Sequence, residues 1–171
     1  MEDKSMKKLL TLLMTTAMLT VGLSGTSLSA HAEADNTAHE KIISETTKYF
    51  EDGSSVTIIV TEESTAPTRT SAYSKSGSKH YVFLSEDKAE LWRFTVHGTF
   101  TVNPGISATC TEDSYSIDIS DDVWHNESAS TYHSGDQAIG DATFIKKILF
   151  ITVYTQNCNI VLSCDSNGNL S

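Results

Sequence analysis

The clearest pattern in the chain is a strict alternation of apolar and polar residues across positions 91–102. Trp92, Phe94 and the following even-numbered residues fall on one face of an extended strand, and Arg93 with the other odd-numbered residues falls on the opposite face. A period of two predicts a strand with one buried and one solvated face, as antiparallel sheets have. The turn sequence Asn103-Pro104-Gly105 is expected to end this strand.

Further stretches of the same kind follow, separated by turn signals. They predict strands at residues 106–110, 114–120, 123–124, 137–144, 148–154 and 159–164. Residues 145–154 are apolar on both faces apart from Lys146 and Lys147, which predicts a central strand guarded at its start by the lysines. Many short strands of this kind predict an all-β fold, either an antiparallel β-sandwich or a partly open barrel.

A separate hairpin is predicted ahead of this domain. Residues 42–50 lead into Asp52-Gly53, a tight-turn signal, and a run of β-branched residues follows as the returning strand. The next segment is rich in Ser and Thr and has almost no apolar side chains, as linkers do. The sequence therefore predicts a β-hairpin arm at residues 33–63, a polar linker at residues 64–78 and the β-sandwich at residues 79–171.

The most apolar stretch, residues 9–23, has the features of a secretory signal peptide. Met6-Lys7-Lys8 gives it a basic start, and Ala30-His31-Ala32 provides an A-x-A cleavage site. We expect residues 1–32 to be removed, with Met6 as an alternative start. The mature protein is expected to be secreted, either released or associated with the cell envelope. No later stretch is long enough for a membrane span.

Removal of this segment makes an acidic chain more acidic. Of the 12 Lys+Arg and 22 Asp+Glu, residues 1–32 hold three lysines and two acids, which leaves 9 against 20, a net charge of −11. Such a charge repels nucleic acids and anionic membrane surfaces, although secreted proteins are often acidic simply to remain soluble. We therefore expect no nucleic-acid partner, and consider an envelope polymer or another protein as partners.

All three cysteines fall in the mature part, where an oxidising compartment permits disulfides. Cys158 and Cys164 lie on one predicted strand, roughly 20 Å apart at about 3.3 Å per residue, whereas bridged Cα atoms lie within about 7 Å. Cys110 is therefore the expected common partner, and Cys164 is favoured because it continues the alternation of Ile160 and Leu162. Cys158 is then free, or available for an intermolecular bridge.

Several short motifs between residues 79 and 171 occur in a recognisable order. They are Leu91-Trp92, Gly98-Thr99-Phe100, Ala108-Thr109-Cys110, the later Trp124 and a closing L-S-C-D-S-N-G-N-L-S. With these motifs the chain resembles an uncharacterised family of small exported β-rich proteins from Gram-positive, often gut-dwelling, bacteria. The resemblance implies an exported all-β protein and carries over no catalytic residue. The turn at residues 103–105 and the apolar residues 148–153 depart from the family pattern.

No motif for catalysis, cofactor binding or metal binding is present, and we expect no cofactor. A metal site needs two or three convergent ligands, and the spacing of His97, His125 and His133 does not show convergence, so we expect them to be solvent-exposed polar residues. Residues 165–169 resemble the opening of a calcium loop, but the Gly stands fourth and no closing carboxylate follows. A Gly-containing turn explains these residues better.

One polar neighbourhood around an aromatic residue is a candidate for ligand contact. Trp124 lies beside Asp121 and His125, and a Trp buried in the core is the competing interpretation. The first hypothesis for function is a secreted, non-enzymatic β-domain that binds a ligand or is associated with the cell envelope. The alternatives are a secreted effector, toxin-like or antimicrobial, and a secreted hydrolase with its site at these three residues.

Overall fold

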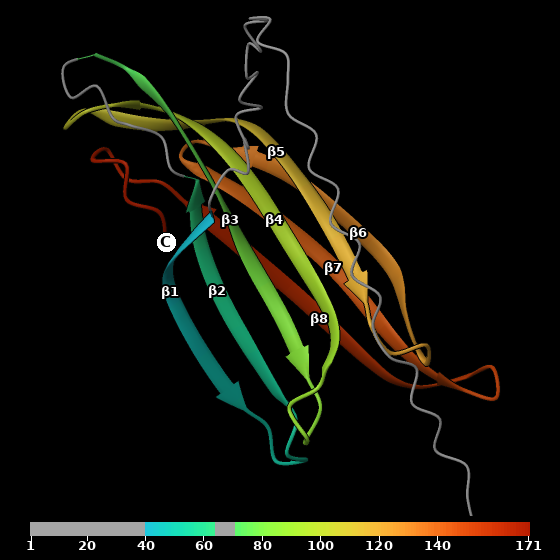
Figure 1. Cartoon of the computed structure of the whole chain (residues 1–171). Coiled ribbons are helices and arrows are strands. Elements are labelled where there is room, and N and C mark those ends of the chain that lie inside the picture. Colours follow the sequence, from blue (N-terminus) through green and yellow to red (C-terminus); the bar gives the residue numbers. More distant parts are fainter. Residues whose placement is uncertain (1–39, 64–70) are drawn as a thin grey trace, which may run out of the picture. The chain divides into compact units, whose positions relative to one another are not determined.

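The computed structural model describes residues 40–63 and 71–171, which form eight strands and no helix (Figure 1). The larger sheet contains β1 (Glu40–Tyr49), β2 (Ser55–Glu63), β3 (Tyr73–Leu84), β4 (Glu90–Asn103) and β5 (Ser107–Ile119). The smaller sheet contains β6 (Trp124–Ser134), β7 (Gln137–Ile148) and β8 (Ile151–Ser163). In each sheet consecutive strands are antiparallel neighbours. The prediction of an all-β antiparallel fold is confirmed.

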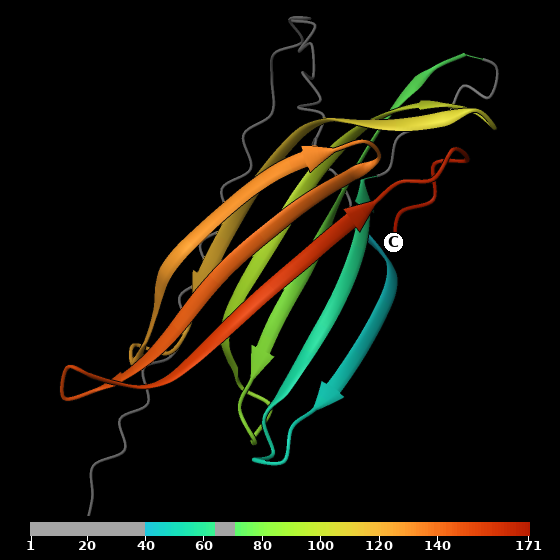
Figure 2. The same ribbon diagram turned by 180° about the vertical axis from the view of Figure 1, so that it is seen from behind.

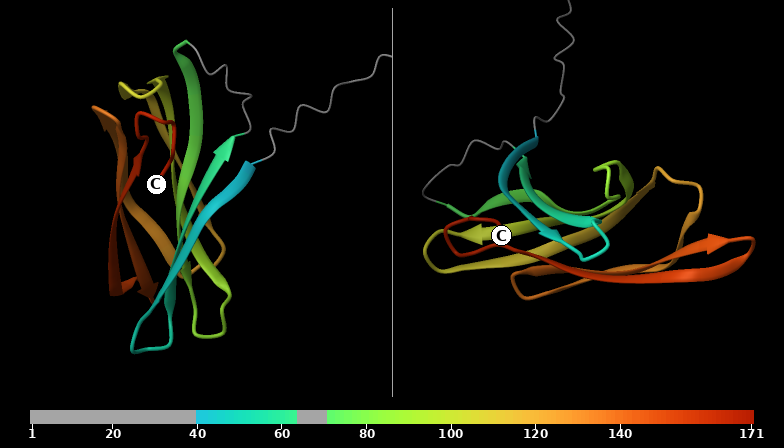
Figure 3. Two further views of the ribbon diagram at one scale, coloured as in Figure 1. Left: turned by 90° about the vertical axis from the view of Figure 1, so that its left-hand side faces the viewer. Right: turned by 90° about the horizontal axis from the view of Figure 1, so that it is seen from below.

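The two sheets pack face to face as two layers (Figures 2 and 3). Within the described segments they remain separate sheets of five and three strands and do not close into a barrel. The β5–β6 turn leads the chain from one layer to the other. The architecture is that of a β-sandwich, the first of the two folds that the alternating pattern predicted.

The core between the sheets contains the residues that the alternation of positions 91–102 selected. The even-numbered residues of β4 in this range are buried. Trp92 stacks on Phe144 of β7 across the layers, with ring centroids 3.8 Å apart and 9° between the ring planes. Tyr81 and Phe83 of β3 stack beside the same indole. This aromatic cluster joins the two layers, and buried rings of this size dominate the energetics of a core.

The predicted hairpin is present and forms part of the larger sheet. Gly53 lies in the β1–β2 turn with a φ of +81°, which glycine adopts without strain. β2 pairs with β3 from Ser55–Leu84 to Glu62–Gly77, so the hairpin is the edge of a continuous sheet. Residues 73–78, within the segment that resembled a linker, belong to β3. Their polar side chains did not signal a strand, but their backbone groups pair with β4.

Two segments with sequence predictions lie outside the described residues. They are residues 1–32, which carry the predicted signal peptide, and residues 64–70, the first part of the predicted linker.

The prediction of a central strand at residues 145–154 was wrong. These residues form the end of β7, a two-residue turn at Leu149 and Phe150, and the start of β8. The register pairs Lys146 with Tyr154 and then Ile148 with Ile151 across this hairpin. The turn was missed because Leu and Phe are not the residues that two-residue hairpin turns favour.

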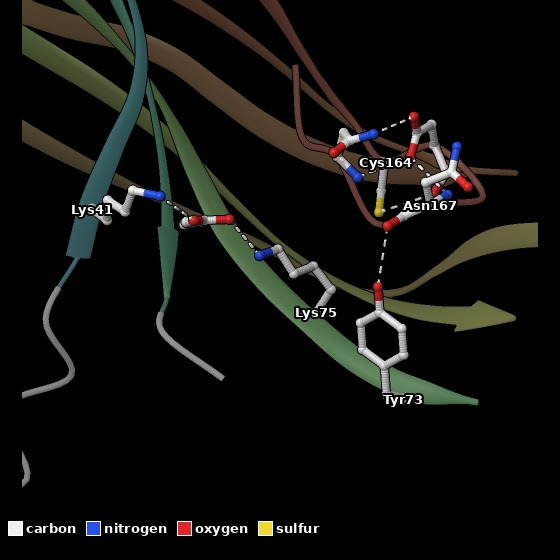
Figure 4. Close-up of polar contacts among 8 residues, drawn as sticks. Lys41, Tyr73, Lys75, Cys164 and Asn167 are labelled. Atoms are coloured by element: carbon white, nitrogen blue, oxygen red, sulfur yellow. Dashed lines mark hydrogen bonds and ion pairs between the residues drawn. The ribbon is translucent and has the colours of Figure 1, made fainter. Parts of the chain in front are cut away.

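The C-terminal residues fold back in a turn that Asp165 organises (Figure 4). Asp165 Oδ1 accepts hydrogen bonds from the backbone N–H groups of Asn167 and Asn169, both at 2.8 Å. The Asn169 side chain donates to Oδ2, and these hydrogen bonds lower the pKa of Asp165. The Tyr73 hydroxyl donates to the Asn167 carbonyl at 3.3 Å and ties the turn to β3 (Figure 4). The interpretation of residues 165–169 as a turn is confirmed.

The predicted disulfide between Cys110 and Cys164 is not formed in the structure, where all three cysteines are buried free thiols. Cys110 and Cys164 flank the β6–β7 turn, since their backbone N–H groups donate to the carbonyls of Gly135 and Asp136, respectively. Each of the two sulfurs donates to a nearby backbone carbonyl instead of pairing with the other. Burial raises the pKa of Cys164 to about 11 and that of Cys158 to about 12, so these thiols pack as small apolar groups.

Candidate functional site

The sequence candidates Asp121, Trp124 and His125 lie where the chain enters β6. Asp121 Oδ1 accepts a hydrogen bond from the N–H of Val123 at 3.0 Å, and the Asp121 carbonyl accepts one from the N–H of Trp124 at 3.1 Å. These bonds turn the chain into the strand. Because successive strand residues point to opposite faces, Trp124 is buried among the core aromatics while His125 is exposed. The structure therefore separates Trp124 and His125 on the two faces of the smaller sheet.

Asp121 and Trp124 line a cleft of about 440 Å³ between the two sheets, here called the turn-end cleft. Its other lining residues are Asp52, Ser54, Phe83, Ser85, Glu86, Leu91, Lys146, Val153 and Tyr154. They come from the β1–β2 and β3–β4 turns, from β3 and β4, and from both strands of the β7–β8 hairpin. The ends of a β-sandwich are where loops gather, and concave sites of this kind are the usual ligand sites of proteins.

The floor of the turn-end cleft is aromatic. The Trp124 ring packs edge-on against Phe83, with centroids 5.4 Å apart, and against Tyr154, with centroids 5.8 Å apart. Phe83 and Trp124 are buried, whereas Tyr154 is 41% exposed. The indole N–H of Trp124 has no hydrogen-bond partner among the described residues. A buried donor without a partner costs free energy, and this nitrogen is enclosed by the core and does not face the cleft.

Carboxylates dominate the charge of the turn-end cleft. Asp52, Glu86 and Asp121 come from three separate turns, and Lys146 is the one basic residue in the lining. The backbone N–H and hydroxyl of Ser54 both donate to Asp52, which lowers the pKa of Asp52 and keeps it ionised. A rim of this kind accepts hydrogen bonds from hydroxyl and amine groups and repels anions.

Two residues of this cleft, Asp121 and Trp124, were predicted from the sequence, and the others were not, although the sequence carries a signal for them. In an up-and-down meander every second turn lies at the same end of the sheets. The turns at residues 50–54, 85–89 and 120–123 are such alternate turns, and each carries adjacent acidic residues. The spacing of these acidic pairs would have placed all three pairs at one end of the sandwich.

His125 and His133, two of the histidines considered as metal ligands, lie in different parts of the structure. His125 lines a separate hollow of about 350 Å³ with Asp122, Val123, Lys147, Leu149 and Phe150. His133 Nδ1 lies 2.5 Å from Asp113 Oδ1, and this contact lowers the pKa of Asp113. In the described segments no group of three His, Cys, Asp or Glu residues is arranged to hold a metal ion.

A polar network that sequence analysis missed runs across the outer face of the larger sheet. The Thr61 hydroxyl donates to Glu40 Oε1 at 2.7 Å and lies 3.3 Å from His80 Nε2. His80 Nδ1 lies 3.0 Å from the Thr95 hydroxyl on β4. Thr61, His80 and Thr95 are buried although they face away from the smaller sheet. Because these groups satisfy one another's hydrogen bonds, we assign the network a structural role.

Acidification is expected to destabilise the protein through His80. Burial lowers the pKa of His80 below its ordinary value of 6.5, despite the opposing charge of Glu40. The unfolded chain therefore takes up a proton more readily than the folded one. Stability present above pH 6.5 is lost as the pH falls towards the depressed value.

Thermal unfolding measured from about pH 8 to about pH 5, above the range of most carboxylates, tests this expectation. As the pH is lowered over this interval, the midpoint temperature of unfolding should fall for the wild-type protein and should fall less for His80→Asn. An identical decline in both proteins would assign the pH dependence to other groups.

No family model, curated protein or solved structure matches the chain. The resemblance to small exported proteins of Gram-positive bacteria stays a prediction. The segments at residues 40–63 and 71–171 contain no helix with the length and apolar character needed to cross a membrane.

Proposed function

We propose that this chain is an exported, non-enzymatic binding protein of the cell envelope, and that an envelope glycan binds in the turn-end cleft. One observation supports this most: an aromatic floor and a carboxylate rim are combined in a single cleft. Ligand sites typically join apolar and aromatic walls with a few polar groups that fix the orientation of the ligand.

A sugar has chemistry that fits both parts of the cleft. The C–H face of a pyranose ring is apolar and can pack on an aromatic side chain such as Tyr154. Sugar hydroxyl groups donate charge-assisted hydrogen bonds to carboxylates, and Glu86 and Asp121 offer such acceptors. The acidic rim repels polyanions, so a neutral or amine-bearing wall glycan fits better than an anionic polymer.

Binding is favoured over turnover because the hydrolase hypothesis gains no support from the geometry. That hypothesis needs Asp121 and His125 to act on one substrate beside Trp124. His125 lines a different hollow from the one that Asp121 and Trp124 share. A general acid or base must be within hydrogen-bond reach of the reacting group, directly or through one water.

Purified protein is expected to co-sediment with insoluble peptidoglycan and to bind tri-N-acetylchitotriose in calorimetric titrations. Glu86→Gln keeps the shape of the rim and removes one charged acceptor. It is expected to weaken binding about tenfold, or about 1.4 kcal/mol, a loss typical of one hydrogen bond to a charged group. Tyr154→Ala is expected to weaken binding to a similar extent because it removes the exposed part of the aromatic floor.

Tyr132→Ala is the matched control. Tyr132 is an exposed tyrosine of the same strand as Trp124, but it lies eight residues further along β6, about 26 Å away. Its loss should leave binding of both probes unchanged. Wild-type affinity in Glu86→Gln and Tyr154→Ala would refute the assignment of the cleft, and failure to bind either glycan probe would refute the choice of ligand.

A further inference from the structure

The β7–β8 hairpin has an exposed apolar tip that the fold does not use. Four consecutive apolar residues, 148–151, form this tip, and Leu149 and Phe150 at its end are 85% and 99% exposed. The hairpin extends beyond the neighbouring β5–β6 turn (Figures 1 and 2). No residue of the described segments covers these side chains, and exposed apolar clusters mark interaction sites.

The backbone of the tip also indicates that these side chains serve a contact. Leu149 and Phe150 have φ values of +48° and +69°. A two-residue hairpin turn with both φ values positive favours Asn-Gly, because bulky side chains disfavour the left-handed region. Leu and Phe therefore oppose the local backbone preference and add nothing to the core. A partner outside the chain would use the apolar surface that they present.

With increasing distance from the tip, the paired residues of the hairpin change from apolar to basic. The register pairs Ile148 with Ile151, then Lys147 with Thr152, then Lys146 with Tyr154. An apolar layer is thus followed by two levels that each carry a lysine, the second with an aromatic partner. The lysines lie about 7 to 10 Å behind Leu149 at about 3.3 Å per residue. A bilayer interface has the same order, and amphipathic elements bury their apolar part about 5 to 10 Å into it.

We propose that the 148–151 tip inserts into the interfacial layer of a lipid bilayer, with Lys147, which lines one hollow with Leu149 and Phe150, contacting lipid phosphates. The tip is too small for a stable protein interface, which typically uses about 20 to 30 residues from each partner. A second copy of the chain is further disfavoured because each copy without residues 1–32 has a net charge of −11. This inference goes beyond glycan binding and does not depend on it.

The test compares protein lacking residues 1–32 with its Leu149→Asn/Phe150→Gly variant. The replacements are residues that this turn prefers, so the hairpin should stay formed, and a thermal midpoint no lower than that of wild type verifies this. Wild-type protein is expected to co-sediment with sucrose-loaded phosphatidylcholine vesicles. The double variant is expected to lose about tenfold or more in partitioning because two apolar side chains no longer enter the bilayer.

Ile106→Asn is the matched control for this loss. The Ile106 side chain is 83% exposed in the β4–β5 turn, at the opposite end of the strands. Its replacement removes a similar exposed apolar side chain and should leave vesicle binding unchanged.

Phe150→Trp reports insertion directly. Native Trp92 and Trp124 are buried, so a change of emission on adding vesicles arises from the introduced indole. We expect a blue shift and quenching by phosphatidylcholine with brominated acyl chains. Lys147→Gln is expected to weaken binding to vesicles that also contain phosphatidylglycerol, because a lysine near an anionic surface is attracted to it.

Equal partitioning of wild type and the double variant would overturn the proposal, as would the absence of a blue shift. Sedimentation velocity without lipid tests the competing occupant. A wild-type dimer that the double variant cannot form, with no vesicle binding, would identify a second copy and also overturn the proposal. Glu86→Gln should keep vesicle binding while its affinity for glycan falls, so the two proposals fail separately.

Discussion

Replacing Gly140 by alanine is expected to destabilise the fold by about 3 kcal/mol, at the upper end of the usual range for overpacked cores. Gly140 lies on β7 facing β4, and a Cβ atom there would be 2.2 Å from Val96 Cγ2 and 3.0 Å from the Phe94 ring. Neither neighbour can move aside easily, since both are fully buried between the sheets. The midpoint of thermal unfolding should fall by roughly 10 °C, given the usual scaling with domain size.

A double-mutant cycle tests whether the clash is the cause. Val96→Ala removes the methyl group nearest to the added carbon, so Gly140→Ala should cost much less in that background than alone. Asp141→Asn is the control on the same strand: its side chain is exposed on the opposite face and keeps an oxygen that can accept from Asn159, so the change should stay within about 0.5 kcal/mol of wild type. An equal cost of Gly140→Ala in both backgrounds would assign the loss to backbone preference instead.

The sequence predicted those parts of the fold in which side-chain period and turn chemistry agree. The alternation of residues 91–102 predicted β4 and its buried face because a strand in one layer of a sandwich has one apolar side, which faces the other layer. Asp52-Gly53 and Asn103-Pro104-Gly105 marked turns because they supply residues that tolerate positive φ, and Gly53 and Gly105 adopt it. From these local rules the all-β class and the sandwich follow.

The tip of the β7–β8 hairpin shows why other parts could not be predicted. A turn is recognised in a sequence by residues that suit its backbone, and Leu149 and Phe150 do not suit theirs. The run therefore resembled a single buried strand. Residues whose own backbone preference conflicts with the conformation that the fold imposes occur most often at functional or strained sites. This is consistent with a contact made by the tip.

The candidate site was predictable only in part because it is assembled from distant turns. Trp124 and Asp121 are close in sequence and were found together, but Glu86 and Asp52 reach the same cleft only through the pairing of the meander. His125 is adjacent to Trp124 in sequence but does not line this cleft, and the cause is the geometry of a strand. A single step along a strand moves a side chain to the other face, so adjacency in sequence does not place two strand residues in one site.

Trp92→Ala is expected to cost about 4 kcal/mol, within the usual range for truncating a buried aromatic side chain to alanine. Trp92 is fully buried and stacks on Phe144 from the other sheet and on Tyr81 and Phe83 from its own. Its loss would remove the centre of the contact between the layers. Urea unfolding followed by far-ultraviolet circular dichroism measures the change without relying on tryptophan emission, and native protein should persist only at low urea.

Trp92→Phe separates the stacking of this ring from its polar group. The indole N–H of Trp92 has no hydrogen-bond partner among the described residues. Phenylalanine keeps an aromatic ring against Phe144 and removes an unpaired buried donor, which costs about 1 to 3 kcal/mol. This gain should offset part of the packing lost with the smaller ring, so Trp92→Phe should lie within about 1.5 kcal/mol of wild type. A loss as large as that of Trp92→Ala would mean that the full indole volume, and not aromatic stacking across the layers, holds the two sheets together.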